Sequence, residues 1–338
     1  MTKPTYTARG PEDLLAMIPF LLGFHPEDSV VLMTFGPPNS FHARVDLPVA
    51  MDDQHAVRDL LMQAVVSNAV RRVALVVYSE DAGATDSQCR LLVEALLDVD
   101  IEIIDVLRAD GERYFVLGDD DDPGTPYDLT SHRFTAERVF DGQVVHRSRA
   151  ELVDTLIGVD EEDATEVALA ADRFADTLLG PDGSRAPEEA LVELRGHARW
   201  LQRRIRDLLR DPQPLPATDA GRMLVLTSVV LTRDVAWSEM TRENSARQVC
   251  LWRELVRRAP RDLLPGVSSL LAFAAWLAGD GALSWCALDR ALEVDPDYSM
   301  AHRVAEALSC AFHPSSWSPV PEAELPIFDD SWRARQAS

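Results

Sequence analysis

Hydrophobic residues in the first 130 positions alternate between helical and strand spacing. The leucines and isoleucine of residues 14–22 recur at helical intervals, which predicts an amphipathic helix ending near residue 22. The continuous apolar run Val30–Phe35 is typical of a strand buried on both faces. Strict alternation over Phe41–Val49 indicates a half-buried strand that pairs with this run as a hairpin and leaves His42 exposed.

The same alternation continues to the acidic run 119–122, where the sheet region is expected to end. Thr85 and Gln88 have the spacing of a capping box, which predicts that a helix begins at Thr85. Alternating elements of this kind favour an α/β fold, with a mixed sheet and flanking helices. The other elements predicted after residue 50 are a helix opened by Asp52 and Asp53, a strand at 72–79, and a hairpin of strands at 101–107 and 113–117.

Beyond residue 130 the apolar pattern is helical throughout, which predicts an all-α region. Three prolines within residues 211–216 mark a hard break between two groups of helices. The predicted helices cover residues 131–140, 148–158, 161–179, 187–210, 219–232, 244–258, 266–278, 282–293 and 299–311. The predicted organisation is an α/β domain at 1–130, a helical extension at 131–210, a helical domain at 217–312 and a tail at 313–338.

The last helices, at residues 265–311, have a pattern that resembles one tetratricopeptide unit. With Pro296 at the terminal proline of the ~34-residue repeat, Ala272 and Ala275 fall at packing positions of the first helix. Ser284 and Ala291 fall at those of the second helix. A plain helical hairpin explains the same pattern, since a stable solenoid needs about three repeats. In the other interpretation the hairpin provides a surface for a partner peptide.

Composition narrows the function classes. The 338 residues carry a formal net charge of −23, which disfavours binding to nucleic acid or to anionic membranes. No apolar run is long enough to span a bilayer, and no secretory signal is visible. The four cysteines are far apart, as in reduced intracellular proteins, so we expect a cytoplasmic location. We also expect no metal and no cofactor, because the eight histidines are scattered and no phosphate-binding or zinc motif occurs.

The corner between the first helix and the first strand is the first candidate site. Gly23 and Pro26 have the positions of a helix end, and capping alone explains most of this segment. The functional alternative places a ligand among the polar side chains that follow. These side chains are His25, Glu27, Asp28 and Ser29.

A second candidate is the loop Ser79–Asp81, with Glu80 between them, which follows a buried strand. Ligands in open α/β sheets bind beyond the carboxyl ends of strands, and the charge here suits a cation better than a phosphate. An ordinary acidic connection explains the same residues. The acidic run 119–122 also suggests calcium, but the twelfth position counted from Asp119 is Thr130, where a calcium loop requires glutamate.

One helix in this acidic protein carries a basic stripe. Its arginines share a face, separate from the leucines and isoleucine of the same helix, and a solvated face paired with nearby carboxylates accounts for such a pattern. The functional alternative is a docking strip for an acidic partner or, less favoured, for nucleic acid. The arginines are Arg195, Arg199, Arg203, Arg206 and Arg210.

Several segments together resemble an actinobacterial family that is known only as a domain of unknown function. The first is Leu14–Val31, which holds the Gly-Phe-His-Pro-Glu-Asp-Ser corner. Arg233-Asp234-x-Ala-Trp237 follows, then Trp-Leu-x-Gly279-Asp-Gly281-Ala, and last Asp-Pro296-x-Tyr-x-Met-Ala. The resemblance implies a cytosolic actinobacterial protein and assigns no reaction. We expect structural roles for Gly23, Pro26, Arg233, Asp234, Trp237, Gly279, Gly281 and Pro296.

The sequence therefore favours a non-enzymatic protein-binding or scaffold protein that acts through its helical half. The alternative is a small-ligand enzyme of hydrolase type, with its site at the His25–Ser29 corner or the Ser79–Asp81 loop. No hydrolase, kinase or dehydrogenase motif occurs in the chain, which weighs against the second interpretation.

Overall fold

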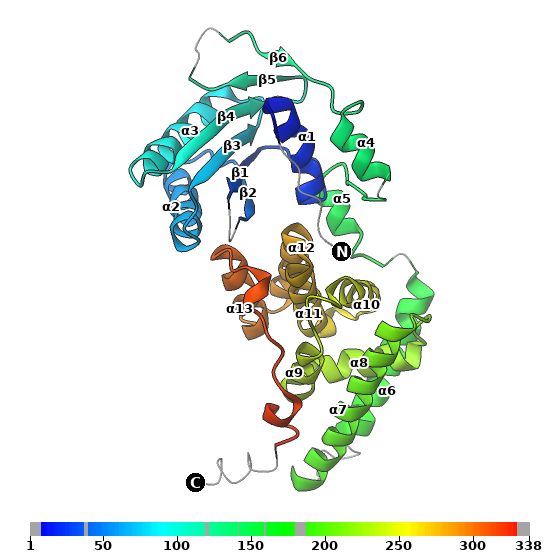
Figure 1. Cartoon of the computed structure of the whole chain (residues 1–338). Coiled ribbons are helices and arrows are strands. Elements are labelled where there is room, and N and C mark those ends of the chain that lie inside the picture. The colour runs from blue at the N-terminus through cyan, green and yellow to red at the C-terminus, as the bar shows by residue number, and fades with distance from the viewer. Residues whose placement is uncertain are drawn as a thin grey trace. The chain divides into compact units, whose positions relative to one another are not determined.

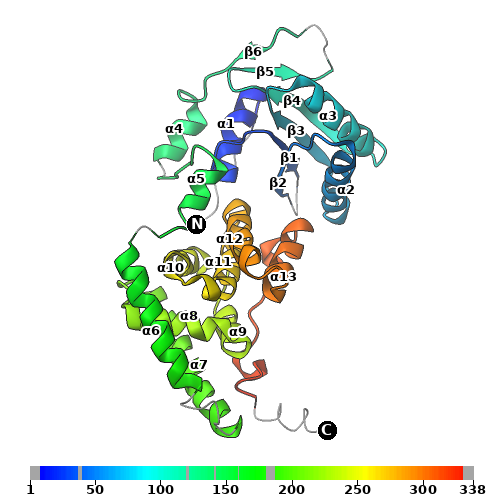
Figure 2. The same ribbon diagram turned by 180° about the vertical axis from the view of Figure 1, so that it is seen from behind.

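The computed structural model describes residues 8–36, 40–118, 122–140, 142–158, 160–179 and 187–329. The chain forms two compact units, and each is described by itself. The first comprises residues 1–152 with 309–313, and the second comprises residues 153–308 with 314–338. Figures 1 and 2 show their elements from opposite sides. The predicted acidic run falls mostly on residues 119–121, which lie outside the described residues.

The first unit is built on a six-stranded mixed sheet with the order β2-β1-β3-β4-β5-β6. Its one parallel pair is β3 with β4, joined by a helix, and the other neighbours are antiparallel. The predicted mixed sheet is thus confirmed. The strands are β1 (Ser29–Phe35), β2 (His42–Asp46), β3 (Arg72–Tyr78), β4 (Glu102–Ala109), β5 (Arg113–Val116) and β6 (Thr125–Pro126).

The expected end of the sheet at the acidic run is wrong, because the chain adds β6 beyond it. Thr125 pairs with Tyr114 of β5, and Gly124 just before it has φ 74°. A two-residue strand has too few positions to show an alternating pattern, so periodicity does not predict it.

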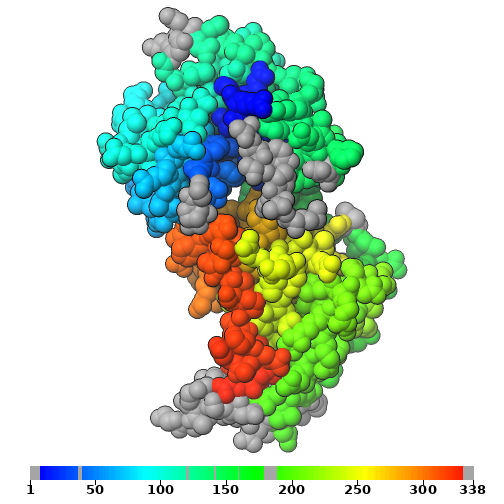
Figure 3. All heavy atoms as spheres, in the orientation of Figure 1, coloured from blue at the N-terminus to red at the C-terminus, as the bar shows by residue number. Residues whose placement is uncertain are grey.

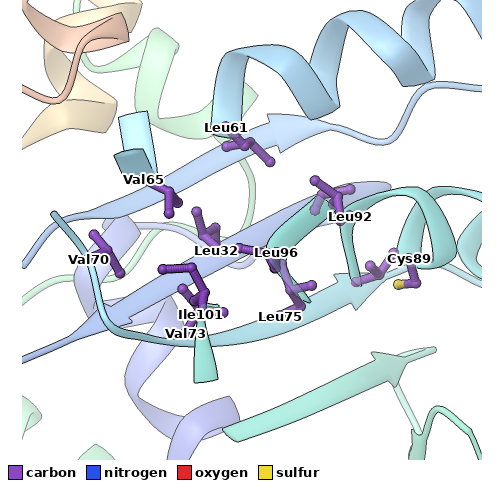
Figure 4. Packing of buried hydrophobic residues seen from close by; sticks show 12 residues of the cluster. Leu32, Leu61, Val65, Val70, Val73, Leu75, Cys89, Leu92, Leu96 and Ile101 are labelled. Atoms are coloured by element: carbon purple, nitrogen blue, oxygen red, sulfur yellow. The ribbon is translucent and has the colours of Figure 1, made fainter. Parts of the chain in front are cut away.

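Two helices cover one face of the sheet. α2 (Met51–Ser67) contributes Leu61 and α3 (Ala82–Leu97) contributes Leu92 to a core that includes Leu32 and Leu75 of the central strands. Figure 4 shows these side chains pointing toward one another between helices and sheet. α1 (Pro11–Leu22) lies on the opposite side of the sheet, where it packs with α4 (Arg133–Phe140). Coverage on both faces explains the continuous apolar runs of β1 and β3.

In the second unit, the described residues form helices and connecting segments, with no strand. Its helices are α6 (Glu161–Leu179), α7 (Pro187–Arg210), α8 (Ala217–Ser228), α9 (Val230–Ser238), α10 (Ser245–Arg258), α11 (Leu264–Ala278), α12 (Gly281–Val294) and α13 (Ser299–Ser309). α5 (Arg149–Asp154) lies at the boundary between the two units. No described helix has both the length and the apolar character needed to cross a bilayer.

The predicted helix 219–232 is two helices, α8 and α9. Val229 breaks it with an extended backbone at φ −90° and ψ 119°. The hydroxyls of Thr227 and Ser228 donate to carbonyls three residues earlier, and such local bonds compete with helix continuation. The apolar periodicity is unaffected by this break, so pattern alone predicted a single helix.

α11 and α12 pack together as a helical hairpin. Gly279 ends α11 in the left-handed region at φ 81°, and Asp280 caps α12 by accepting a hydrogen bond from the Leu283 amide at 2.9 Å. Ser284 Oγ donates to the Ala272 carbonyl at 2.7 Å, so the two helices approach closely at small residues. The hairpin matches the predicted helices, while its likeness to a tetratricopeptide unit stays a prediction.

Gly221 on α8 sets the distance between α8 and α6, since a Cβ atom there would lie 2.5 Å from the backbone nitrogen of Ala171. We therefore expect Gly221→Ala to lower the free energy of unfolding by about 1–3 kcal/mol, the range for overpacking. Gly196→Ala on α7 is the matched control. It has open space around it and should raise stability by about 0.5–1 kcal/mol.

Urea unfolding followed by tryptophan fluorescence checks this expectation. All seven tryptophans lie at or after Trp200, so the signal reports the second unit. Equal stability of the two alanine variants would contradict the close approach of α6 and α8.

Candidate functional site

The first candidate corner begins as a helix cap, as predicted. Gly23 has φ 77°, and its amide donates to the Pro19 carbonyl at 2.8 Å. Pro26 is buried just beyond it. The backbone of His25 is held by His146, whose carbonyl accepts from the His25 amide at 3.0 Å. The imidazole of His25 is exposed, and no hydrogen bond or ion pair joins it to another described side chain.

His25 does line a small hollow that the sequence did not predict. Its volume is about 240 Å³, and its walls come from α1, α4 and the segment before α5. Pro19, Phe20, Val139 and Val145 make most of the lining apolar. The signal for it was weak, because the lining residues belong to two stretches, 16–25 and 129–145, that are far apart in sequence.

The two predicted candidate segments meet at one edge of the sheet. Ser29 at the start of β1 pairs with Tyr78 at the end of β3, so residue 28 and residue 79 become neighbours. Ser79 Oγ donates to Asp28 Oδ1 at 3.1 Å and accepts from the Asp81 amide at 3.2 Å. Asp28 has φ 39°, a left-handed conformation that aspartate tolerates better than most residues.

The buried side chain of Ser29 stabilises the corner through hydrogen bonds. Its side chain is fully buried, its hydroxyl donates to the Glu27 carbonyl, and it accepts from Arg44 Nε at 2.8 Å. Arg44 also pairs with Asp46 at 2.5 Å. A hydroxyl that is buried and bonded on both sides is not placed to attack a substrate.

The loop after β3 forms the N-terminal cap of α3. Asp81 is the N-cap of α3, because its Oδ1 accepts from the Ala84 amide at 3.0 Å. The predicted capping box at Thr85 and Gln88 is wrong. α3 begins three residues earlier, Thr85 donates its hydroxyl to the Asp81 carbonyl, and both residues are fully buried. Capping-box spacing within the first helical turns was mistaken for the start itself.

Acidic groups dominate this edge of the sheet. Glu27, Asp28, Glu80 and Asp81 are all exposed. Two arginines lie nearby: Arg108 donates to the Ser79 carbonyl at 3.3 Å, and Arg44 donates to the Glu27 carbonyl at 3.3 Å. Within the described ranges, no three His, Cys, Asp or Glu side chains gather closely enough to hold a metal ion. The edge therefore offers exposed carboxylates, a helix cap and the hydroxyl–carboxylate pair of Ser79 and Asp28.

In the second unit, Arg233 is locked in the interior. Only 5% of it is exposed, Nη2 donates to Asp234 at 2.8 Å and Nη1 donates to the Tyr298 hydroxyl at 3.1 Å. Burial lowers the pKa of Arg233, but the bonds to Tyr298 and Asp234 outweigh it and raise the pKa above its ordinary value. Arg233 thus stays charged and joins α9 to Tyr298, just before α13.

Trp237 belongs to an aromatic cluster. Its ring stacks on Trp317, with centroids 5.4 Å apart and planes 7° apart, and meets Phe273 edge to face at 5.3 Å. Trp317 Nε1 donates to the Met240 carbonyl at 2.9 Å. The segment after α13 is thereby anchored to the helical core.

The remaining motif residues lie at helix ends and in the turns between helices. Gly279 needs its left-handed conformation, whereas a Cβ at Gly281 would meet only Leu308 at 3.9 Å, an ordinary contact. Pro296 follows the end of α12, and its carbonyl lies 2.7 Å from the His302 ring. These residues shape turns and offer no ligand group.

The basic stripe lies on α7, and carboxylates from distant segments reach it. Arg206 forms a bidentate pair with Glu239, with both nitrogens 2.7 Å from its oxygens, and these hydrogen bonds raise the pKa of Arg206. Arg199 lies 3.4 Å from Glu322. Arg210 pairs with Asp207 on its own helix, and Arg203 is exposed without a described partner.

Residues 317–329, called the C-terminal segment below, cover this face. Leu325 and Ile327 are 4% and 1% exposed, and they pack with Ala198 of α7 and Val235 of α9. Burial of two such side chains contributes about 1.5–3 kcal/mol each. In Figure 3 the red C-terminal segment lies directly against the yellow-green helices of its unit.

Polar bonds fix the position of the C-terminal segment. Arg195 Nε donates to the Ile327 carbonyl at 2.8 Å, and Gln202 donates to Glu322 at 3.1 Å. The guanidinium of Arg199 lies 4.8 Å from the centre of the Phe328 ring. The sequence predicts a tail at residues 313–338, and its pattern does not reveal this docked position. The available signal was a cluster of apolar residues within an acidic stretch.

If Asp81 is a cap, Asp81→Ala should weaken the start of α3 by about 1 kcal/mol, while Asp81→Ser should retain most of the stability. Glu80→Ala is the neighbouring control and should change stability by less than about 0.5 kcal/mol, as exposed substitutions do. Hydrogen exchange of the residue 82–97 amides measures both effects. Identical exchange in the Asp81→Ala and Glu80→Ala proteins would remove the capping role.

Comparison with known proteins supports the resemblance inferred from the motifs. A sequence model described as a domain of unknown function, DUF4192, matches residues 11–315. No curated protein and no solved structure matches the chain. The matched residues hold every motif named above and end just before the C-terminal segment. Since the match covers most of the 338 residues, the chain belongs to the DUF4192 family.

Proposed function

We propose that this protein is a protein-binding module, and that the face formed by α7 and α9 receives an acidic, hydrophobic segment of a partner protein. The observation that carries the proposal is the occupant already present on that face. The C-terminal segment is held there by arginine–carboxylate pairs and by Leu325 and Ile327 as apolar anchors. These are the contact types that give protein interfaces their affinity.

Charge gives this face its selectivity. The chain as a whole carries −23 and repels acidic macromolecules at long range, while α7 attracts carboxylates at short range. At physiological salt the range of such forces is about 8 Å. A suitable partner therefore presents its acidic groups on a short segment and pairs them with hydrophobic anchors.

The α11–α12 hairpin belongs to the same proposal. Its likeness to a tetratricopeptide unit, supported by the close approach at Ser284 and Ala272, suits a helical scaffold. A cytoplasmic setting is also proposed, and the free thiols of the four cysteines fit a reducing compartment.

The alternative, a small-ligand enzyme at the sheet edge, rests on one observation. The Ser79–Asp28 hydrogen bond unites two segments that the sequence singled out separately. The binding role has the stronger support, because Asp81 caps α3, Ser29 is bonded to Glu27 and Arg44, and no described hydrogen bond joins the His25 ring to either.

Reversing charge on α7 tests the binding role. We expect the Arg199→Glu/Arg203→Glu protein to lose a partner that the wild type captures from its native host, because the partner's carboxylates would meet like charges. Affinity purification with mass spectrometry identifies the partner, and a synthetic peptide of its acidic segment then measures the affinity. Binding should weaken at least about tenfold, the size of effect for a disrupted charge pair at an interface.

Arg210→Glu is the control on the same helix, since it makes one such charge reversal, against two in the test protein, away from the C-terminal segment. It should alter the peptide affinity by no more than about twofold, as for an exposed ion pair. Equal capture and equal affinity in all three proteins would rule out α7 as the binding face.

A further inference from the structure

The C-terminal segment has two parts that are anchored separately. Trp317 is fixed in the aromatic cluster, and Glu322–Phe328 dock on α7 and α9. Between them, residues 318–321 are exposed and lie outside helices and strands. An exposed link of four residues therefore connects the docking part to Trp317.

The docking part also lies outside the family domain. The family match ends at residue 315, yet Leu325 and Ile327 beyond it share one buried apolar cluster with Ala198 and Val235 within it. A face that belongs to the family domain is thus filled by residues beyond that domain. Such an arrangement is expected of a ligand-like segment more than of a core element.

We propose that residues 322–328 are an exchangeable internal ligand that occupies the α7–α9 face until a partner segment of the same chemistry displaces it. This inference rests on the proposed binding function and names its regulation. The partner segment would carry a carboxylate in place of Glu322 and apolar side chains in place of Leu325 and Ile327. Arg199 and the apolar residues between α7 and α9 would then hold the incoming segment.

The tether sets how strongly the internal ligand competes. A short link gives an effective concentration on the order of 1 mM at the face. A partner segment present at about 1 µM must therefore bind roughly 10³-fold more tightly than the free docking sequence to occupy half of the sites. Acidic sequences that bind weakly would be excluded. The apparent association constant of every partner would fall by the fraction of molecules in which residues 322–328 occupy the face.

Binding of a fluorescent peptide with the sequence of residues 317–329 to the full chain tests this proposal by anisotropy. The Leu325→Asp/Ile327→Asp protein should bind the peptide at least about tenfold more tightly than the wild type, because its own segment no longer docks. Adding Arg199→Glu and Arg203→Glu to that protein should abolish the gain. The Val320→Asp/Ala323→Asp protein is the matched control, with the same added charge at exposed positions, and should behave as the wild type does.

Tryptophan fluorescence and urea unfolding establish that each variant is folded. If the double aspartate variant fails to fold, Glu322→Lys takes its place, with an expected gain of about threefold, since only the ion pairs are lost. A folded variant that binds the peptide no more tightly than the wild type overturns the internal-ligand proposal. In the unmodified chain, excess peptide should also speed hydrogen exchange at residues 322–328, and unchanged exchange would count equally against the proposal.

Two outcomes distinguish failure of the internal-ligand proposal from failure of the proposed binding function. If native partner binding depends on Arg199 and Arg203 while the peptide result is negative, the face binds partners without internal competition. If native partner binding ignores these arginines while peptide exchange occurs, the segment is exchangeable and the partner role fails.

Discussion

Leu325 and Ile327 of the C-terminal segment share one buried apolar cluster with Ala198 of α7 and Val235 of α9. Beside this cluster, Arg199 pairs with Glu322 of the same segment. An apolar centre with a charged rim is also the composition of protein interfaces. The proposed binding role depends on this combination of apolar anchors and ion pairs on one face.

The basic stripe on α7 is not merely solvated, because two of its arginines bind carboxylates from other segments. Arg206 finds Glu239 on the helical core, while Arg199 finds Glu322 on the C-terminal segment. One pair is internal to the family domain and the other is supplied from beyond it. Exposed pairs of this type contribute about 0–1 kcal/mol, so they orient the segment, and the apolar anchors supply most of its stability.

Local patterns predicted most helices and strands, because periodicity and caps are encoded in neighbouring residues. The end of α1 at Gly23 and the turn at Gly279 follow from the left-handed conformation that glycine allows. The failures arose where local signals conflict or are too short. Hydroxyl back-bonding at Thr227 broke a helix that the apolar pattern carried through, and β6 is too short for any periodicity.

The candidate sites depended on contacts that sequence spacing does not contain. Asp28 and Ser79 are adjacent only because β1 lies antiparallel to β3 in one particular register. Arg199 and Glu322 are more than a hundred positions apart. The residue types were visible in the sequence, but the geometry that gives them a role was not.

Charge and hydrophobicity together limit what can occupy the α7–α9 face. A polyanion such as nucleic acid offers phosphates to Arg199 but nothing to fill the place of Leu325, and the net charge of −23 opposes its approach. A purely apolar peptide would fill the groove and leave Arg199 without the carboxylate it contacts now. Only a segment that combines both features replaces every contact that the internal occupant makes. The internal occupant therefore describes, residue by residue, the partner chemistry that the proposed binding role requires.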